Sequence, residues 1–310
     1  MKYKILPIAG DASFRKFYRF VLNNNSKIIV SSKKEKYENL LAYSAINKFL
    51  RQNKILTPKL FAHDYPKGII VIEDFGDISF YKVLLRQKRK LTTYKKLIDL
   101  LLKIQKIKAK SKIKNIIGKP HIINKYSNKY LHKESDLFFD WYLPLFLDKK
   151  KVLKVKKKTK KILSLLYNSL NFPNSCFVHR DYHAQNLMKV GSKIGVIDSQ
   201  DALIGNPAYD LVSLIDDVRI RTSRKLKDQI YSYYLKRTFK TYRINSKKFS
   251  EDFNILSVKR SLKIIGIFSR LLTRDKKKIY IKYIPYTWRL LEMRIKGEIF
   301  SELRKSQKIS

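Results

Sequence analysis

The chain has 310 residues, 44% of them hydrophobic and 13% aromatic, which excludes an intrinsically disordered chain and allows two lobes with their own cores. The single cysteine, Cys176, excludes an internal disulfide, as expected for the reducing cytoplasm. The net charge of +44 is typical of nucleic-acid-binding proteins, but lysines are spread over nearly every segment alongside many Ile, Asn and Tyr, so we favour compositional bias.

The first 75 residues predict strands and one helix. The apolar stretch after the basic start breaks at Pro7 and Gly10, too early for a signal peptide. Two β-rich segments, 14–22 and 27–31, are joined by the turn-forming sequence NNNS. Residues 36–52 have the apolar spacing of a helix. A hairpin turning at YPKG then follows, and its second strand, IIVI, is predicted to be fully buried.

The rest of the chain predicts mainly helices. The lysine run at 149–161 carries Val and Leu at positions that fit one amphipathic helix with a solvated face. Short strands are expected only around 177–199. No apolar run reaches the about 18 residues of a membrane span, so we expect a cytoplasmic protein that does not enter membranes. The sequence EDFGD separates a β-rich lobe, 1–77, from a larger helical lobe, 78–310.

Polar residues concentrate in one stretch that apolar residues flank. His179, Asp181 and Asn186 form the pattern H-x-D-x-x-x-x-N, and Asp198 follows an apolar strand twelve residues later. Asn186 and Asp198 supply the hard oxygen ligands that suit Mg²⁺. Asp181 is then left to orient a hydroxyl and accept its proton, so the pattern indicates phosphoryl transfer.

Three other interpretations compete for the same stretch. His179 and His183 would align as zinc ligands only on a helix, and no Cys or Glu stands ready nearby. A Ser-His-Asp hydrolase would need a nucleophile elbow, which is absent. A purely structural role suits His179, which we expect to brace the loop, but it does not account for Asp181, Asn186 and Asp198 together.

The sequence resembles the aminoglycoside phosphotransferase and choline kinase superfamily. Within it, the similarity is greatest to the bacterial kinases that phosphorylate the anomeric hydroxyl of N-acetylmuramate and N-acetylglucosamine. The segments that carry the resemblance are AGDASFRKFYR (9–19), IEDFGD (72–77), HRDYHAQNLM (179–188), GVIDSQDALIGNPAYDLVSLIDD (195–217) and KIIGIFSRLLTRDKKKIYIKYIP (263–285). The resemblance implies an α+β, bilobal, protein-kinase-like fold.

The resemblance also implies roles for individual residues. Asp181 would be the catalytic base, and Asn186 and Asp198 would hold Mg²⁺. Asp210 would support the site structurally, as would His179. The remaining implied contacts are to ATP: the adenine would meet the hinge around Glu73, Asp74 and Phe75, and the phosphates would meet Ser13.

The nucleotide-binding segment departs from the usual kinase pattern. Its phosphate loop has only Gly10, and Val30 and Ser31 stand near the place where a phosphate-binding lysine is expected. The branch that the sequence resembles also lacks that lysine. Arg15 is our candidate for neutralising the phosphates, and a solvated strand arginine is an equal alternative.

The acceptor end is harder to interpret. Glu134, Asp140 or Trp141 could line a sugar site, although aromatic residues at this density are more often core. Arg270, with Arg274, could bind a carboxylate, and surface salt bridging explains them equally well. We therefore expect an ATP- and Mg²⁺-dependent kinase whose partners are ATP and a small sugar, N-acetylmuramate or N-acetylglucosamine, in cell-wall recycling.

Two alternatives remain open for the function. One is a kinase for another small hydroxylated acceptor, such as choline, homoserine or an aminoglycoside. The other is a non-catalytic kinase fold that binds anionic partners, nucleic acid included. We favour the first interpretation over both, because a binding protein has no use for the triplet Asp181, Asn186 and Asp198.

Overall fold

The computed structural model describes residues 3–8, 15–23, 25–32, 37–242 and 245–307. The chain divides into two compact units. The first comprises Met1–Asn124 and His179–Ile204, and the second Lys125–Val178 and Gly205–Ser310. Among the described residues, none of the helices is both long enough and apolar enough to span a bilayer.

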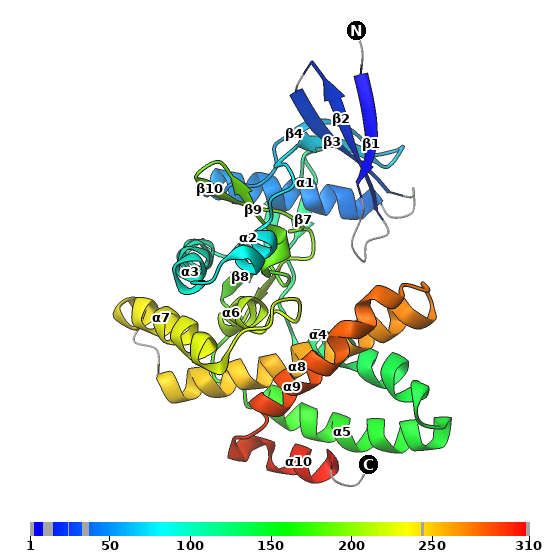
Figure 1. Ribbon diagram of the computed structural model, residues 1–310, viewed down its shortest axis with the longest axis vertical. Helices are drawn as coiled ribbons and strands as arrows, with labels where there is room; N and C mark the ends of the chain where they lie inside the picture. The colour runs from blue at the N-terminus through cyan, green and yellow to red at the C-terminus, as the bar shows by residue number, and fades with distance from the viewer. Residues whose placement is uncertain (1–2, 9–14, 24, 33–36, 243–244, 308–310) are drawn as a thin grey trace. The chain divides into compact units, whose positions relative to one another are not determined.

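The first unit contains a five-stranded antiparallel sheet (Figure 1). Its spatial order is β1-β2-β3-β5-β4. The strands are β1 (Tyr3–Ile8), β2 (Lys16–Leu22), β3 (Asn25–Ser31), β4 (Leu60–Asp64) and β5 (Ile69–Glu73). The segments predicted at 14–22 and 27–31 correspond to β2 and β3, with Phe14 outside the described residues, and the YPKG hairpin joins β4 to β5.

Two details of this sheet differ from the prediction. The strand β1 was not expected; it contains Pro7, which an edge strand tolerates because its missing N–H leaves no ladder bond unmade. The second strand of the hairpin, β5, is not buried on both faces. Ile70 and Ile72 are buried in the cluster with Leu40 and Tyr43, whereas the alternate residues of the strand are half-buried.

The helix α1 (Tyr37–Gln52) packs against this sheet. Leu40 and Tyr43 from the helix share a core cluster with Val30, Ile70 and Ile72 from the strands. Burying apolar side chains at this spacing is what stabilises an amphipathic helix on a sheet, at about 25 cal/mol per Å² of apolar surface. The helix begins and ends within a residue of the predicted range.

The remainder of the first unit surrounds a short hairpin. It contains α2 (Phe80–Arg86), α3 (Leu91–Gln105), β6 (Lys112–Lys114), β7 (Pro120–Ile122), β9 (Leu187–Val190) and β10 (Lys193–Val196). The hairpin β9–β10 turns at Gly191, whose φ of +56° suits glycine. Backbone bonds from Lys189 to Ile78 and from Val196 to Leu56 attach both of its strands to the first part of the chain.

The second unit is mainly helical. Its elements are α4 (Asn128–Leu137), a π-helical turn (Phe138–Tyr142), a 3-10 turn (Leu143–Leu145), α5 (Lys149–Asn168), β8 (Cys176–Val178), α6 (Ala208–Ile215), α7 (Arg224–Tyr242), α8 (Ser246–Thr273), a 3-10 helix (Lys278–Tyr283), α9 (Ile284–Arg294), a 3-10 turn (Glu298–Phe300) and α10 (Ser301–Gln307). The short strand β11 (Leu203–Gly205) lies at the boundary of the two units.

The 28-residue helix α8 is the centre of the second unit. Gly266 allows close approach, because a Cβ there would collide with the backbone of Leu137 and Phe138. A buried ion network also joins the helices: Asp216 accepts hydrogen bonds from Lys227, Arg294 and Ser257. A β-rich beginning followed by a mainly helical remainder is the α+β architecture that the sequence predicts.

Candidate active site

The loop 179–186 is anchored at both sides within the first unit. His179 is fully buried, and its Nε2 lies 3.0 Å from the carbonyl oxygen of Ile197. Burial lowers the pKa of His179, against the opposing effect of the carboxylates of Asp181 and Asp198. Tyr182 donates from its hydroxyl to the carbonyl of Leu97 in α3 at 2.8 Å. These contacts hold the loop that carries the predicted base.

Asp181 and Asn186 are joined through the backbone of this loop. The Asn186 side-chain amide donates to the Asp181 carbonyl at 3.0 Å. That bond uses the N–H side of the amide, and within the described residues the amide oxygen accepts no hydrogen bond from the protein. The Asn186 carbonyl in turn accepts from the N–H of Ile197 at 3.0 Å, which brings the residue before Asp198 beside the loop.

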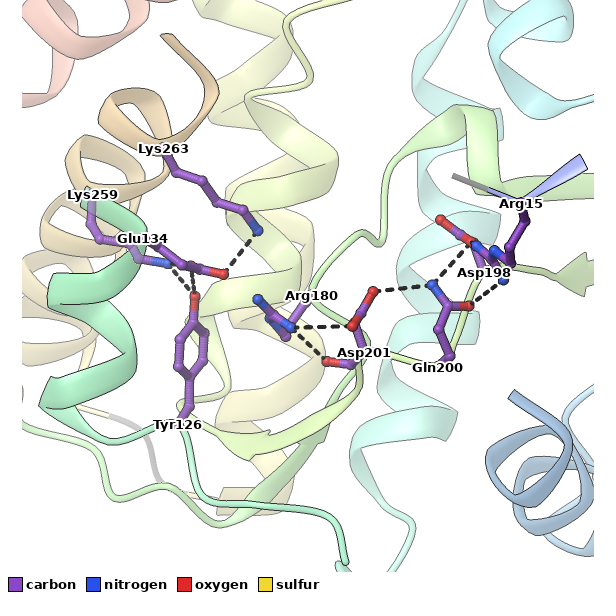
Figure 2. Close-up of polar contacts among 9 residues, drawn as sticks. All are labelled: Arg15, Tyr126, Glu134, Arg180, Asp198, Gln200, Asp201, Lys259 and Lys263. Atoms are coloured by element: carbon purple, nitrogen blue, oxygen red, sulfur yellow. Dashed lines mark hydrogen bonds and ion pairs between the residues drawn. The ribbon is translucent and has the colours of Figure 1, made fainter. Parts of the chain in front are cut away.

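Asp198 has an unusual backbone and two protein partners. Its φ of +66° lies in the left-handed region, which is strained for a residue other than glycine and is a feature often found at functional sites. One carboxylate oxygen accepts from Arg15 at 2.5 Å and from Gln200 at 3.1 Å (Figure 2). Its side chain remains 37% exposed, so the carboxylate is also open to solvent.

The chemistry of this donor set fits a magnesium ion. The amide oxygen of Asn186 and the carboxylate of Asp198 are hard oxygen donors, and Mg²⁺ needs only one or two protein ligands beside water and phosphate. By contrast, His179 and His183 belong to no metal-binding group of three or more His, Cys, Asp and Glu side chains, since the described residues contain none. The described residues therefore offer no donor set that supports the zinc interpretation.

Arg15 is buried rather than solvated. Its exposed fraction is 7%, and its guanidinium lies over the rings of Phe17 and Tyr43, at 5.5 and 5.9 Å from the ring centroids. It also donates to Gln200 at 3.1 Å. The predicted phosphate-binding arginine therefore contacts the predicted metal-binding aspartate. Ser13, the other residue expected at the phosphates, lies outside the described residues.

The predicted hinge follows β5 directly. The backbone N–H of Glu73 donates to Lys59, and its carboxylate accepts from the Lys59 N–H and lies 3.6 Å from Arg51. Phe75 is buried and packs on Gly195 of β10, where a Cβ would lie 2.5 Å from the ring. Phe75 therefore lies against β10, the strand that ends two residues before Asp198.

Sequence reasoning missed several residues that organise this region. Gln200 bridges Arg15 and Asp198, and the Ser199 hydroxyl donates to Asn47 of α1 at 2.7 Å. A second missed group lies at the hinge, where Arg19 of β2 forms ion pairs with Asp74 and Asp77 that hold its pKa above the usual value. The sequence shows only that these polar residues lie next to the motifs. It does not show which of them contact one another.

Asp210, predicted for support beside His179, and the residues predicted for the acceptor lie in the second unit. Asp210 is fully buried in the first turn of α6. Asp140 forms an exposed ion pair with Lys156 at 2.6 Å. Arg274 is bound by Asp275 through two hydrogen bonds. Arg270 is half-buried, and its Nε has no hydrogen-bond partner among the described residues.

Glu134 lies in a buried cluster of the second unit. Its carboxylate accepts from Tyr126 and Lys259, and Lys263 lies 3.0 Å away (Figure 2). The Lys259 ammonium also lies over the rings of Tyr126 and Tyr209, and burial lowers its pKa well below the usual value. Direct contact of Glu134 with an acceptor therefore stays a prediction.

Comparison with known structures shows a protein-kinase-like fold. A choline/ethanolamine kinase family protein from Mesorhizobium loti superposes with a TM-score of 0.64 at 12% identity, covering 99% of this chain and 93% of that one. A choline kinase from Streptococcus pneumoniae gives a TM-score of 0.63 at 13% identity, covering 94% and 93%. The bilobal α+β prediction is confirmed.

The family follows from the sequence itself. A sequence model of the phosphotransferase enzyme family matches residues 4–244, and the chain belongs to that family. It is similar to the N-acetylmuramate/N-acetylglucosamine kinase of Pseudomonas aeruginosa, with 27% identity over 292 residues, 93% of this chain and 83% of that protein. The kinase of the same name from Neisseria meningitidis is 27% identical over 284 residues, 89% and 81% of the two chains. The chain is therefore a small-molecule phosphotransferase, as predicted.

Proposed function

We propose that this enzyme is a cytoplasmic kinase that uses ATP and Mg²⁺ to phosphorylate the anomeric hydroxyl of N-acetylmuramate or N-acetylglucosamine. The product, a sugar 1-phosphate, would re-enter the synthesis of cell-wall precursors. The observation that carries the proposal is the similarity to kinases named for these two sugars, at 27% identity over 93% of the chain in the Pseudomonas aeruginosa case.

The roles proposed for the loop residues follow from their chemistry. Asp181 would orient the acceptor hydroxyl and accept its proton. Asn186 and Asp198 would hold the metal, through the amide oxygen that the loop leaves without a hydrogen bond and through the open carboxylate. Bound Mg²⁺ would neutralise charge on the transferred phosphate. His179 and Asp210 would support these groups without contacting the reacting atoms.

ATP would bind to the lobe 1–77, which we propose as the nucleotide-binding part of the chain. The backbone around Glu73 and Phe75 would meet the adenine. Arg15 and Ser13 would meet the phosphates. Arg15 supports this role because it is a buried guanidinium already next to the carboxylate of Asp198, and phosphates that share a metal with that carboxylate would come within its reach.

The acceptor would be recognised in part by Arg270. N-acetylmuramate carries a carboxylate that N-acetylglucosamine lacks, and arginine suits bidentate recognition of a carboxylate. Arg274 already forms two hydrogen bonds with Asp275, whereas the Arg270 Nε has no partner among the described residues. Glu134 and Asp140 are proposed as further acceptor contacts, and both already pair with lysines.

The test is ATP consumption with separate acceptors in the presence of Mg²⁺: N-acetylmuramate, N-acetylglucosamine, choline, homoserine and kanamycin. We expect turnover with an N-acetylated amino sugar, lowered by about 100-fold or more in Asp181→Asn because a general base is lost. Asp228→Asn, an exposed carboxylate on α7, is the matched control. Turnover only with another acceptor would contradict the assignment to cell-wall sugars, and turnover with none would contradict the proposed kinase.

A further inference from the structure

The first unit contains a cavity that none of the proposed roles uses. Its volume is about 310 Å³, within the range of small-ligand sites. The helix α1 lines one side with Lys48 and Phe49, and the segment around β6 lines the other with Lys110, Lys112, Ile113 and Lys114. All of these residues belong to the same compact unit.

The charges around this cavity have a single sign. Four of its lining residues are lysines, and no acidic residue lines it among those that the structure describes. All four lysines are exposed. Within the described part of the chain, none of them forms an ion pair with a carboxylate, although lysines elsewhere do so, such as Lys156 and Lys160 on α5. Four ammonium groups that repel one another around a hollow favour an anionic ligand of several charges.

The apolar part of the cavity comes from Phe49 and Ile113, which are 6% and 8% exposed. Both are fixed by their elements: Phe49 lies on the buried side of α1, and Ile113 is the buried centre of β6. A ligand would therefore contact a rigid apolar wall while its charges remain among the flexible lysine side chains. This combination differs from a solvated lysine run, which has no hollow beside an apolar wall.

We propose that this cavity, the lysine pocket, binds a small ligand that carries a chain of two or more phosphate groups. Lysine binds phosphate as a point charge that can turn toward it, and several phosphates are needed to match four lysines. The polyphosphate group is found both as an inorganic chain and on nucleotides. A nucleotide adds a sugar and a base to the phosphates, so comparing its binding with that of the inorganic chain distinguishes the two sources.

The lysine pocket is connected to Asp198 through two intervening residues, Asn47 and Ser199. Asn47, adjacent to Lys48 on α1, accepts a hydrogen bond from Ser199, the residue after Asp198. Tyr43, one turn earlier, lies against Arg15, and burial raises the pKa of its phenol to about 12, so it stays neutral. A ligand that contacts one side of this helix turn would therefore affect the groups on its other side.

The test measures binding of inorganic tripolyphosphate to the full chain by calorimetry, without Mg²⁺ or ATP. The variant is the double substitution Lys112→Glu with Lys114→Glu. The matched control is Lys154→Glu with Lys158→Glu, two exposed lysines on α5, which changes the net charge equally. We expect binding to weaken by about tenfold or more in the pocket variant only, because charge-assisted contacts are lost. Equal weakening in both variants, or none in either, would overturn the proposal.

Two further measurements keep the result interpretable. Thermal unfolding of both variants should match that of the parent chain, since all four substituted lysines are exposed. If the pocket variant fails to fold, the double substitution Lys48→Gln with Lys110→Gln replaces it. Amide NMR signals of Lys48 and Ser199 should move together on titration with tripolyphosphate.

A second experiment compares guanosine triphosphate with tripolyphosphate. If guanosine triphosphate binds more tightly, and this binding is lost in the pocket variant, the ligand is a nucleotide. If it binds more weakly, the ligand is the inorganic chain.

Discussion

Arg15 and Asp198 show how single residues decide the state of the candidate site. Both groups were selected from the sequence, one for phosphate and one for metal, and the structure joins them at 2.5 Å. The guanidinium neutralises a carboxylate that sits on a left-handed backbone. The same guanidinium is the group proposed above to meet the phosphates of ATP.

Replacing Arg15 with methionine should lower kcat/KM for ATP by about 10- to 100-fold, because hydrogen bonds to charged groups contribute about 1.5–3 kcal/mol. Methionine keeps much of the apolar contact with Phe17 and Tyr43. Lys16→Met, at the exposed neighbouring position, is the control and should change little. Steady-state kinetics at varied ATP would measure the effect; equal values for Arg15→Met and the parent chain would remove Arg15 from the site.

Asp216 has the opposite role, since it stabilises the fold without belonging to the site. It is buried between Lys227 and Arg294. Desolvation raises its pKa, but the two cations, together with hydrogen bonds from Arg294 and Ser257, outweigh this and hold the pKa well below the ordinary range of an aspartate carboxyl. Because the folded pKa is the lower one, its stabilisation is present above about pH 4 and is lost as the pH falls further.

Replacing Asp216 with asparagine should therefore destabilise the protein by about 3–5 kcal/mol at neutral pH, since the buried Lys227 and the partly buried Arg294 lose their partner. The variant should also lose less stability than the parent chain between about pH 5 and pH 3, since this carboxylate no longer titrates. Urea unfolding at several pH values would measure both effects. Parallel pH curves for the two proteins would show that Asp216 contributes nothing to acid unfolding.

At the scale of elements, the close packing of α8 on the turn after α4 depends on one glycine. A Cβ at Gly266 would meet the backbone of Leu137 and Phe138, which cannot rotate away as a side chain could. The apolar pattern of α8 predicts the helix, but it does not predict which residue lies at the crossing. The sequence likewise does not predict that Gly195 contacts Phe75, which lies about 120 residues earlier in the chain.

Gly266→Ala should destabilise the protein by about 1–3 kcal/mol or more through overpacking, although alanine favours an isolated helix by about 1 kcal/mol over glycine. The control is Gly297→Ala: nothing lies within 4 Å of its Cβ position, and its φ of −66° suits alanine. Melting temperatures of the two variants would decide. A Gly266→Ala protein at least as stable as the parent would show that α8 packs less closely than described.

Elements of the sheet were partly predictable. The β-rich segments predicted at 14–22 and 27–31 correspond to the strands β2 and β3. The turn between them is tighter than the predicted NNNS, because Asn25 already pairs with Leu22. The three-residue strands β6 and β7 were missed, since such short segments show no periodicity and depend on pairing with each other.

At the scale of the whole molecule, the net charge of +44 creates a field that acts on every ligand. Its range is about 10 Å at 0.1 M salt and shrinks as salt rises. The charge does not select one partner, because the lysines are distributed over the whole chain. It does distinguish a charged acceptor from a neutral one.

Raising the salt concentration from about 0.05 to 0.5 M should raise KM for N-acetylmuramate severalfold more than KM for N-acetylglucosamine, because only the former carries a carboxylate to be attracted. Both reactions use ATP, so the comparison of the two acceptors removes the effect of salt on the nucleotide. Sucrose at equal osmolarity is the control. A KM ratio that does not change with salt would mean that the charge has no influence on acceptor binding.

The sequence by itself determined the family, the α+β architecture and the loop residues proposed for catalysis, because the motif H-x-D-x-x-x-x-N and the apolar periodicities are local. Only the tertiary structure decided which distant residues meet. Arg15 pairs with a carboxylate 183 positions away, and the lysine pocket joins residues around 48 with residues around 112. Local patterns depend on the nearest neighbours in the chain, whereas such pairings depend on how the elements pack, which no single segment encodes.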